Sequence, residues 1–178
     1  MQIDKTKAWV DRAVIGLNLC PFAKAPQVKG LVRYVVSHVD NHKALLDDLR
    51  HELLNLQVSP PAICETTLLI HPHALINFLE YNDFLDSADA LLLELNLEGV
   101  LQIASFHPAY QFAGTTADDI SNYTNRSPYP MLHILRESSL DAAFNGTDDP
   151  NAIADAIVAR NQKTLAELGH EGWEKLWI

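Results

Sequence analysis

The sequence predicts an α/β (or α+β) fold, a layered sheet of at least four strands with helices packed on it. Segments with apolar residues at helical spacing alternate with short apolar, β-branched runs. Strand–helix–strand connections recur along the chain, which allows parallel pairing in much of the sheet. A ferredoxin-like variant with added helices is the alternative. The length of 178 residues suits a single globular domain, residues 1–178.

The first half of the chain is expected to form a helix, a strand and a second helix. Apolar residues recur at helical spacing over residues 4–19, and Pro21 ends that helix. The β-branched run LVRYVVSHV predicts a strand over residues 31–39. Asp40 and Asn41 are favourable N-caps, so we expect the second helix over residues 42–56.

Two more strands follow, with a helix between them. The run ETTLLIH predicts a strand over residues 65–71. Pro72 suits the first turn of the next helix, and Gly99 closes it. The run VLQIASFH then predicts a strand over residues 100–107.

A long polar stretch, residues 108–130, precedes the fourth strand, which we expect over residues 131–137. Within this stretch Thr116 and Asp119 have capping-box spacing, which predicts a short helix over residues 117–125. Most loops have about 4–6 residues, and much longer ones are often binding loops or lids. The stretch is therefore the first place to look for a site.

The last helix is expected to start at Pro150, with Asp149 as its N-cap, and to stop at Gly169. The segment beyond it carries three apolar residues at helical spacing: Trp173, Leu176 and Trp177. These side chains are expected either to dock on the body of the protein or to form a dimer contact.

The amino-acid composition argues against nucleic acid and membrane as partners. The net charge of −10 opposes nucleic-acid binding, and no run of basic residues offsets it. No stretch approaches the ~20 apolar residues of a membrane span, and the charged start is unlike a signal peptide. We therefore expect a cytoplasmic protein with Cys20 and Cys64 as free thiols. Neither a cofactor nor an oligomeric state is predicted.

His107 is the first candidate catalytic residue, because it lies at the predicted carboxyl end of a strand, where open α/β sheets bind ligands. An imidazole titrates near neutral pH and can act as a general acid or base, with Asp119 to orient it. The alternative is a histidine whose ring nitrogens satisfy backbone groups of the loop.

Arg126 is the first candidate for substrate binding. Its guanidinium can hold a carboxylate or phosphate bidentately, and Asn125 adds donors. A structural pair with Asp118 or Asp119 is the alternative. Tyr129 belongs to a group of aromatic residues that either line a pocket for a flat ligand or pin the loop to the core: Tyr110, Phe112, Tyr123 and Tyr129.

Arg136 and Cys20 complete the candidates. Arg136 alternates with apolar residues in its strand, so it either pairs with a buried carboxylate or lines a pocket. Cys20 is a nucleophile only where a positive neighbour lowers its pKa, and otherwise a small buried hydrophobe. The nucleotide-binding and hydrolase motifs GxGxxG, GxxxxGK[ST], GxSxG and CxxC are absent.

Three segments resemble a bacterial family, the one catalogued as domain of unknown function 1415. They are LNLCPFA at residues 17–23, SFHPAYQFAG at 105–114 and DDISNYTNRSPYPMLHILRE at 118–137. The resemblance covers nearly the whole chain and includes Cys20, His107 and Arg126. It raises interest in Cys20, but it implies no activity and assigns no catalytic residue.

Three hypotheses about function follow from these residues. The first is an enzyme acting on a small anionic metabolite, with a carboxylate or a phosphate. The second is a metal-binding protein that uses His107, His133 and either Cys20 or an acidic residue; a buried, structural His133 is the alternative. The third is a non-catalytic factor whose long loop grips a partner protein, which requires exposed loop aromatics.

Overall fold

The computed structural model describes residues 1–144 and 150–177. The strands are β1 (Val32–Val36), β2 (Thr66–Ile70), β3 (Leu101–Phe106) and β4 (Met131–Arg136). The α-helices are α1 (Gln2–Trp9), α2 (Lys24–Val28), α3 (His42–Val58), α4 (Phe78–Glu94), α5 (Glu137–Phe144) and α6 (Pro150–Lys175). A π-helix, η1 (Val10–Ile15), and a 3-10 helix, η2 (Ile120–Thr124), complete the described elements.

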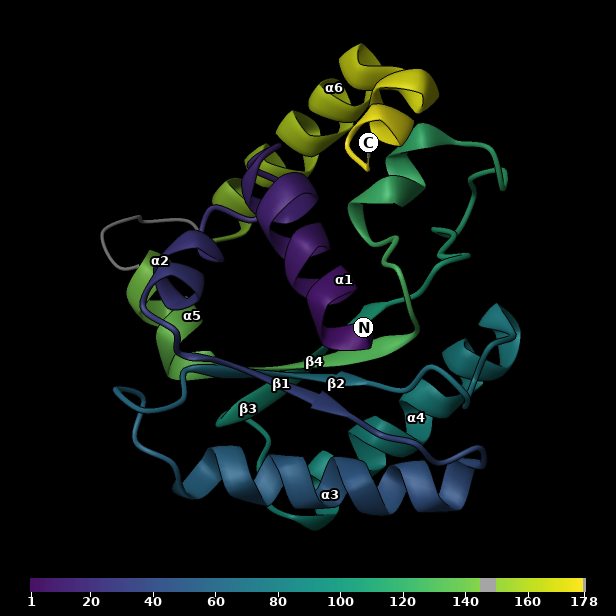
Figure 1. Cartoon of the computed structure of the whole chain (residues 1–178). Helices are drawn as coiled ribbons and strands as arrows, with labels where there is room; N and C mark the ends of the chain where they lie inside the picture. The colour runs from purple at the N-terminus through teal and green to yellow at the C-terminus, as the bar shows by residue number, and fades with distance from the viewer. Residues whose placement is uncertain (145–149, 178) are drawn as a thin grey trace.

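The sheet is mixed and has the strand order β1-β2-β4-β3 in the described part of the chain (Figure 1). This confirms the predicted α/β class. Parallel pairing is limited to β1 with β2, because β4 enters between β2 and β3 and runs antiparallel to both. The unit β2-α4-β3, with β4 between its strands, is the split β-α-β arrangement of ferredoxin-like folds. The direct β1-α3-β2 unit departs from them.

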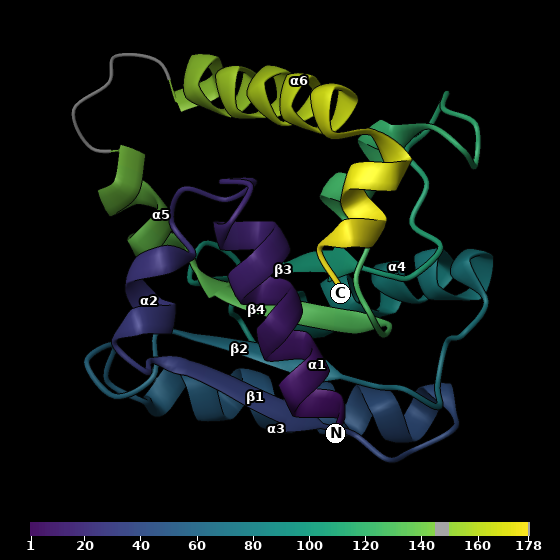
Figure 2. The ribbon, with the colours of Figure 1, turned by 45° about the horizontal axis from the view of Figure 1, so that its top comes forward.

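Helices cover both faces of the sheet (Figures 1 and 2). Helices α3 and α4 pack on one face, here the α3 face, where Leu69 and Leu132 are fully buried. Helix α1 and parts of α6 pack on the other, here the α1 face, against Leu68 and Met131. Successive strand residues point to opposite faces, so the adjacent apolar residues of β2 serve both cores.

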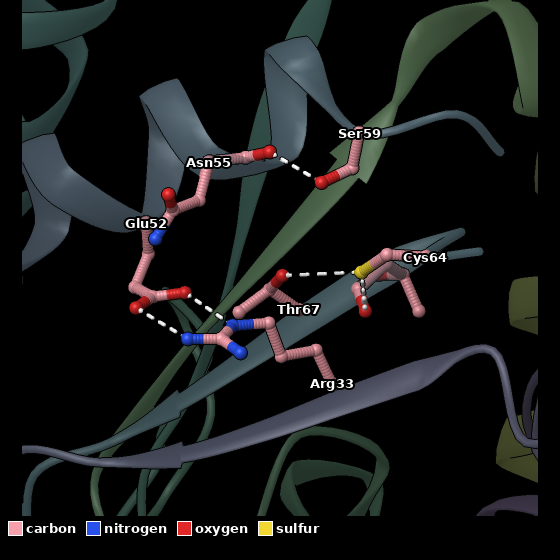
Figure 3. A network of polar contacts seen from close by, with 7 residues as sticks. Arg33, Glu52, Asn55, Ser59, Cys64 and Thr67 are labelled. Atoms are coloured by element: carbon pink, nitrogen blue, oxygen red, sulfur yellow. Dashed lines mark hydrogen bonds and ion pairs between the residues drawn. The ribbon is translucent and has the colours of Figure 1, made fainter.

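Hydrogen bonds fasten the edge strand β1 to α3 (Figure 3). Arg33 donates to both carboxylate oxygens of Glu52, at 2.8 and 3.1 Å. The Glu52 side chain is only 5% exposed. A buried carboxylate costs free energy unless it is paired and hydrogen bonded, and Arg33 meets both conditions.

Side-chain caps set the starts of α3 and α4. Asn41 accepts from the backbone N–H of Ala44 at 3.0 Å, as its predicted N-cap role requires. Helix α4 begins six residues later than Pro72 suggested, because Asn77 accepts from the N–H groups of Leu79 and Glu80 and caps it there. Residues 72–76 instead form a turn followed by irregular chain.

The other differences from the predicted elements lie near helix-breaking residues and at the end of a strand. Helix α2 follows Pro21 and was not predicted, and α5 starts at Glu137, where a strand was expected to end. Gly169 breaks α6 with φ 64° and ψ 176°, as expected, but the chain then continues helically to Lys175. The predicted cap Asp149 lies outside the described residues. Within those residues, no helix has the length and apolar character needed to cross a bilayer.

The predicted helix over residues 4–19 divides into α1 and the π-helix η1. The Gly16 N–H closes the wider turn by donating to the Asp11 carbonyl, five residues back, at 3.0 Å. A Cβ atom at Gly16 would press on the carbonyl oxygen of Arg12, a backbone atom. The π-helical turn therefore requires glycine at this position.

Replacing Gly16 with alanine is expected to lower the free energy of unfolding by about 2 kcal/mol, because a backbone carbonyl must shift to admit the methyl group. Gly172→Ala is the matched control, since its Cβ would meet only the movable side chain of Leu168. Urea denaturation measures both variants. Equal stability of the two would show that the π-helical turn accepts a side chain.

Candidate functional site

A pocket of about 530 Å³ lies where α1 and η1 meet the Arg126 loop and the C-terminal segment of the chain. Figure 2 shows α1 with the last helical turns and the η2 region beside it. We call it the basic aromatic pocket. It is lined by Lys5, Ala8, Trp9, Arg12, Pro108, Tyr123, Arg126, Ser127, Pro128, Trp173 and Trp177. Its volume lies in the range of about 300–1,000 Å³ typical of small-molecule sites.

The first helix supplies one wall. Ala8 and Trp9 lie three and four residues after Lys5, and Arg12 lies four and three residues after them, which places all four on one helix face. Trp9 is buried and forms the base of this wall. Its indole N–H donates to the carbonyl of Arg126 at 2.9 Å, so the helix and the loop are joined directly.

Arg126 supplies the loop side of the pocket. Its Nε donates to the Tyr110 carbonyl at 3.2 Å, and Nη2 donates to the Ala117 carbonyl at 2.6 Å. The guanidinium carbon lies 4.4 Å from the centre of the Tyr123 ring, a cation–π contact. The predicted pair with Asp118 or Asp119 is replaced by these carbonyl contacts. Arg126 thus both organises the long loop and faces the pocket.

The C-terminal segment after Gly169 supplies the aromatic wall. Trp173 makes edge contacts with Tyr123 at 4.9 Å and with Trp177 at 5.7 Å between ring centres. Arg12 anchors the segment by donating to the Leu176 carbonyl at 2.8 Å. Trp173 is buried, so it follows the first of the two sequence alternatives, docking on the body, whereas Trp177 is 41% exposed.

The charges of the pocket have one sign. Lys5, Arg12 and Arg126 line it, and no Asp or Glu among the residues that the structure describes does so. None of the three takes part in an ion pair within the described residues. In a chain with a net charge of −10, such a cluster is a local positive field that attracts anions.

His107 does not line this pocket. It is 1% exposed and turns to the α3 face, where its ring lies 5.3 Å from Phe78 and 5.1 Å from Tyr81. Its Nδ1 accepts from the N–H of Ala109 at 3.0 Å, so Nε2 carries the proton and donates to the Leu75 carbonyl at 3.1 Å. Burial also lowers the pKa of His107. This is the geometry of the alternative stated above, a histidine that satisfies the loop backbone.

Asn125 and Asp119 hold the loop rather than contact His107 through their side chains. Asn125 donates to the Ser105 carbonyl at 3.1 Å, and its own carbonyl accepts from the His107 N–H at 3.2 Å. Asp119 caps η2 by accepting from the Ser121 N–H at 2.9 Å, and hydrogen bonding from the side chain and then the backbone of Ser121 lowers the pKa of Asp119. The backbones of residues 107 and 125 are therefore hydrogen bonded to each other. The side chains of His107 and Arg126 nevertheless point in different directions.

Arg136 lies on the α3 face, away from the pocket. It is buried, and Nη2 donates to the carbonyls of Leu56, Ser59 and Cys64 at 2.8, 2.6 and 3.0 Å. The last carbonyls of a helix have no intrahelical partner and carry its negative dipole end. Arg136 thus caps the C-terminus of α3, a role that neither sequence alternative included.

Cys20 and His133 lie apart from the basic aromatic pocket as well. Burial raises the pKa of the Cys20 thiol, although N–H groups of Phe22 and Ala23 oppose this, so the thiol stays protonated at neutral pH. His133 Nε2 lies 2.8 Å from the Thr66 hydroxyl, and burial lowers the pKa of His133 to about 4. The described residues contain no group of three His, Cys, Asp or Glu side chains placed to hold a metal ion.

The loop aromatics are half-buried. Tyr110 packs on Phe78 and Phe112, at 5.2 and 5.0 Å between ring centres, and Tyr129 packs against the core of the α1 face. Tyr123 alone of the four lines the pocket. The partner-binding hypothesis required exposed loop aromatics, so this packing weakens it.

Sequence reasoning missed most of the pocket. Lys5, Trp9 and Arg12 carried a usable signal, because basic and aromatic residues share one helix face at spacings of four and three. The partners Trp173 and Trp177 lie more than 160 residues further along the chain. Nothing local in the sequence joins them to that face.

Comparisons with known proteins place the chain in a family without naming an activity. Neither the curated proteins nor the solved structures gave a match. The family model described as "Protein of unknown function (DUF1415)" matches residues 1–175, which is nearly the entire sequence. The chain therefore belongs to the DUF1415 family of proteins of unknown function.

Proposed function

We propose that this protein binds a small anionic molecule in the basic aromatic pocket. The observation that carries the proposal is the set of lining charges: Lys5, Arg12 and Arg126, with no carboxylate among the lining residues. A cluster of like charges without counter-ions destabilises the folded state. A bound anion removes that repulsion. An anionic ligand would therefore explain why the three cations lie together.

Free hydrogen-bond donors support the proposal. Arg126 uses Nε and one Nη2 hydrogen for backbone carbonyls, and Arg12 uses one Nη1 hydrogen. A guanidinium has five N–H donors, so both side chains keep donors for a ligand. The Lys5 side chain is exposed, and its ammonium is free to approach an anion. Hydrogen bonds between these groups and a carboxylate or phosphate are charge-assisted and therefore strong.

The residues that line the pocket favour binding over catalysis. The lining residues include no His or Cys, and the Ser127 hydroxyl donates to the Tyr129 carbonyl at 2.7 Å. The predicted acid–base and nucleophilic residues, His107 and Cys20, lie outside the pocket. The hypothesis of an enzyme that acts on an anionic metabolite therefore stays a prediction. The pocket supports its substrate-binding part and not its catalytic part.

Replacing Lys5 with glutamine is expected to weaken binding of phenyl phosphate, a dianionic probe, about tenfold, because one charge-assisted contact is lost. Arg12→Gln is expected to have at least the same effect, since Arg12 also anchors Leu176. Intrinsic fluorescence is a direct readout, because the chain has three tryptophans and all of them line the pocket. Rising salt should weaken binding further.

Lys43→Gln is the matched control. It removes the same charge from an exposed position in the first turn of α3, on the other face of the sheet. Its affinity for phenyl phosphate should equal that of the original protein. Equal losses in Lys5→Gln and Lys43→Gln would attribute binding to overall charge, and absence of any fluorescence response to millimolar phenyl phosphate or succinate would reject the proposal.

A further inference from the structure

Aromatic rings are the second feature of the basic aromatic pocket. Trp9, Tyr123, Trp173 and Trp177 all line it, although tryptophan is rare in this chain. These rings come from three separate parts of the sequence. Inorganic phosphate or a short dicarboxylate uses only the charges and leaves most of the 530 Å³ empty.

Three of the four rings already have structural partners. Trp9 is 3% exposed and packs on Phe106 at 5.2 Å between ring centres. The Arg126 guanidinium covers Tyr123, and Trp173 is buried against it. These side chains form the floor and sides of the pocket, and each already packs against another side chain.

Trp177 differs from the other three. It is 41% exposed, and its ring contact within the described residues is the edge contact with Trp173. A partly exposed indole beside cations is a favourable platform for a flat ring, because planar rings stack on aromatic side chains.

The position of Trp177 is tied to the charged wall. Arg12 donates to the carbonyl of Leu176, the residue before Trp177, and the Leu176 N–H donates to the Trp173 carbonyl at 3.1 Å. One arginine therefore both lines the basic side and fixes the segment that carries the aromatic side. This arrangement sets a defined distance between an anion at the cations and a ring at Trp177, which reduces the entropy lost on binding.

We infer that the ligand carries a flat aromatic ring beside a multiply charged anionic group, in the class of aryl phosphates and mononucleotides, with the ring stacked on Trp177. The inference rests on the proposed function, because the anionic group occupies the three cations. The three positive charges favour a dianionic group over a monoanionic one.

Three probes separate the parts of this inference: phenyl phosphate, methyl phosphate with the charge alone, and benzyl alcohol with the ring alone. Calorimetric titration of the full chain is expected to show phenyl phosphate binding at least about tenfold more tightly than methyl phosphate. Trp177→Ala should remove that advantage and leave the methyl phosphate affinity unchanged, whereas Trp177→Phe should keep most of it. Leu54→Ala, at an equally exposed apolar site on α3, is the control.

The outcomes distinguish this inference from the proposal on which it rests. Equal affinities for the two phosphates, unaffected by Trp177→Ala, would overturn the aromatic ligand and leave anion binding standing. Failure of both phosphates to bind would overturn both. Benzyl alcohol binding as tightly as phenyl phosphate, with no loss in Lys5→Gln, would show an apolar site and overturn the anionic group.

Discussion

Replacing Arg136 with methionine is expected to lower the free energy of unfolding by about 4 kcal/mol and to leave phenyl phosphate binding unchanged. The guanidinium donates to three carbonyls at the end of α3 and in the following loop, and it is buried. Methionine fills a similar volume but removes the donor that the three carbonyls share. The Leu56 carbonyl keeps the Ser59 N–H at 3.2 Å, whereas the Ser59 and Cys64 carbonyls lose the Arg136 hydrogen bond while desolvated. Urea denaturation and calorimetric titration measure the two quantities.

Two further variants distinguish the stability that comes from the several N–H donors of the guanidinium from the stability that comes from a positive charge at position 136. Arg136→Lys keeps the positive charge near the helix end but offers a compact ammonium, so we expect it to recover only part of the stability. Arg50→Met, at an exposed ion pair with Glu94, should change stability little. Loss of anion binding without loss of stability in Arg136→Met would contradict the capping role and restore Arg136 as a ligand residue.

Lowering the pH from 7 to 4 is expected to destabilise the protein by about 3 kcal/mol through His71 alone. Its side chain is fully buried, Nδ1 donates to the Ala74 carbonyl at 2.9 Å, and Nε2 has no hydrogen-bond partner in the described part of the chain. Burial, more than any other cause, lowers the pKa of His71 to about 4, from 6.5. The unfolded chain therefore takes up this proton at a higher pH than the folded chain does. The stabilisation is complete above pH 6.5 and is lost as the pH falls toward 4.

His133 adds a loss in the same direction, because burial lowers its pKa to about 4 as well. Part of its side chain is exposed, so we expect the smaller contribution from it. Between pH 6.5 and 5 most carboxyl groups have not begun to titrate. The slope of stability against pH in this window therefore reports on buried histidines.

His71→Asn tests the assignment. Asparagine keeps an N–H donor for the Ala74 carbonyl but cannot titrate, so the slope should flatten by up to about 1.4 kcal/mol per pH unit. The variant is also expected to be less stable at pH 7, because the ring that stacks on Tyr81 at 5.9 Å is lost. His51→Asn, at an exposed position on α3, is the control. An unchanged slope in His71→Asn would assign the acid sensitivity to other groups.

The regular elements could be predicted because their signals are local. Alternating and helical hydrophobic patterns located all four described strands to within three residues at each end, and Asn41 marked the start of α3 correctly. The start of α4 was misplaced, since Asn77 is a better cap than the first turn offered by Pro72. The split of the first helix at η1 depended on Gly16 and its close approach to Arg12, which has no separate sequence signature.

The candidate site was predicted in part. The stretch around Arg126 does face a pocket, as its rigid, polar composition suggested. His107 was predicted beside Arg126. The backbone of His107 does lie next to the Arg126 stretch, but a strand directs successive side chains to opposite faces. Phe106 faces α1, so His107 at the next position faces α4 and is sealed there. A shift of one residue in the strand would have turned this imidazole toward the face that carries the pocket.

By itself, the sequence determined the α/β class, the helices and strands, and the loop that contributes Arg126, because hydrophobic periodicity, caps and prolines act within a few residues of the chain. The tertiary structure alone decided which residues share the basic aromatic pocket. Lys5 and Arg12 meet Arg126 and Trp177 because α1 and the end of α6 pack on the same face of the sheet. Such contacts arise from burial of apolar surface between distant segments, which no local pattern records.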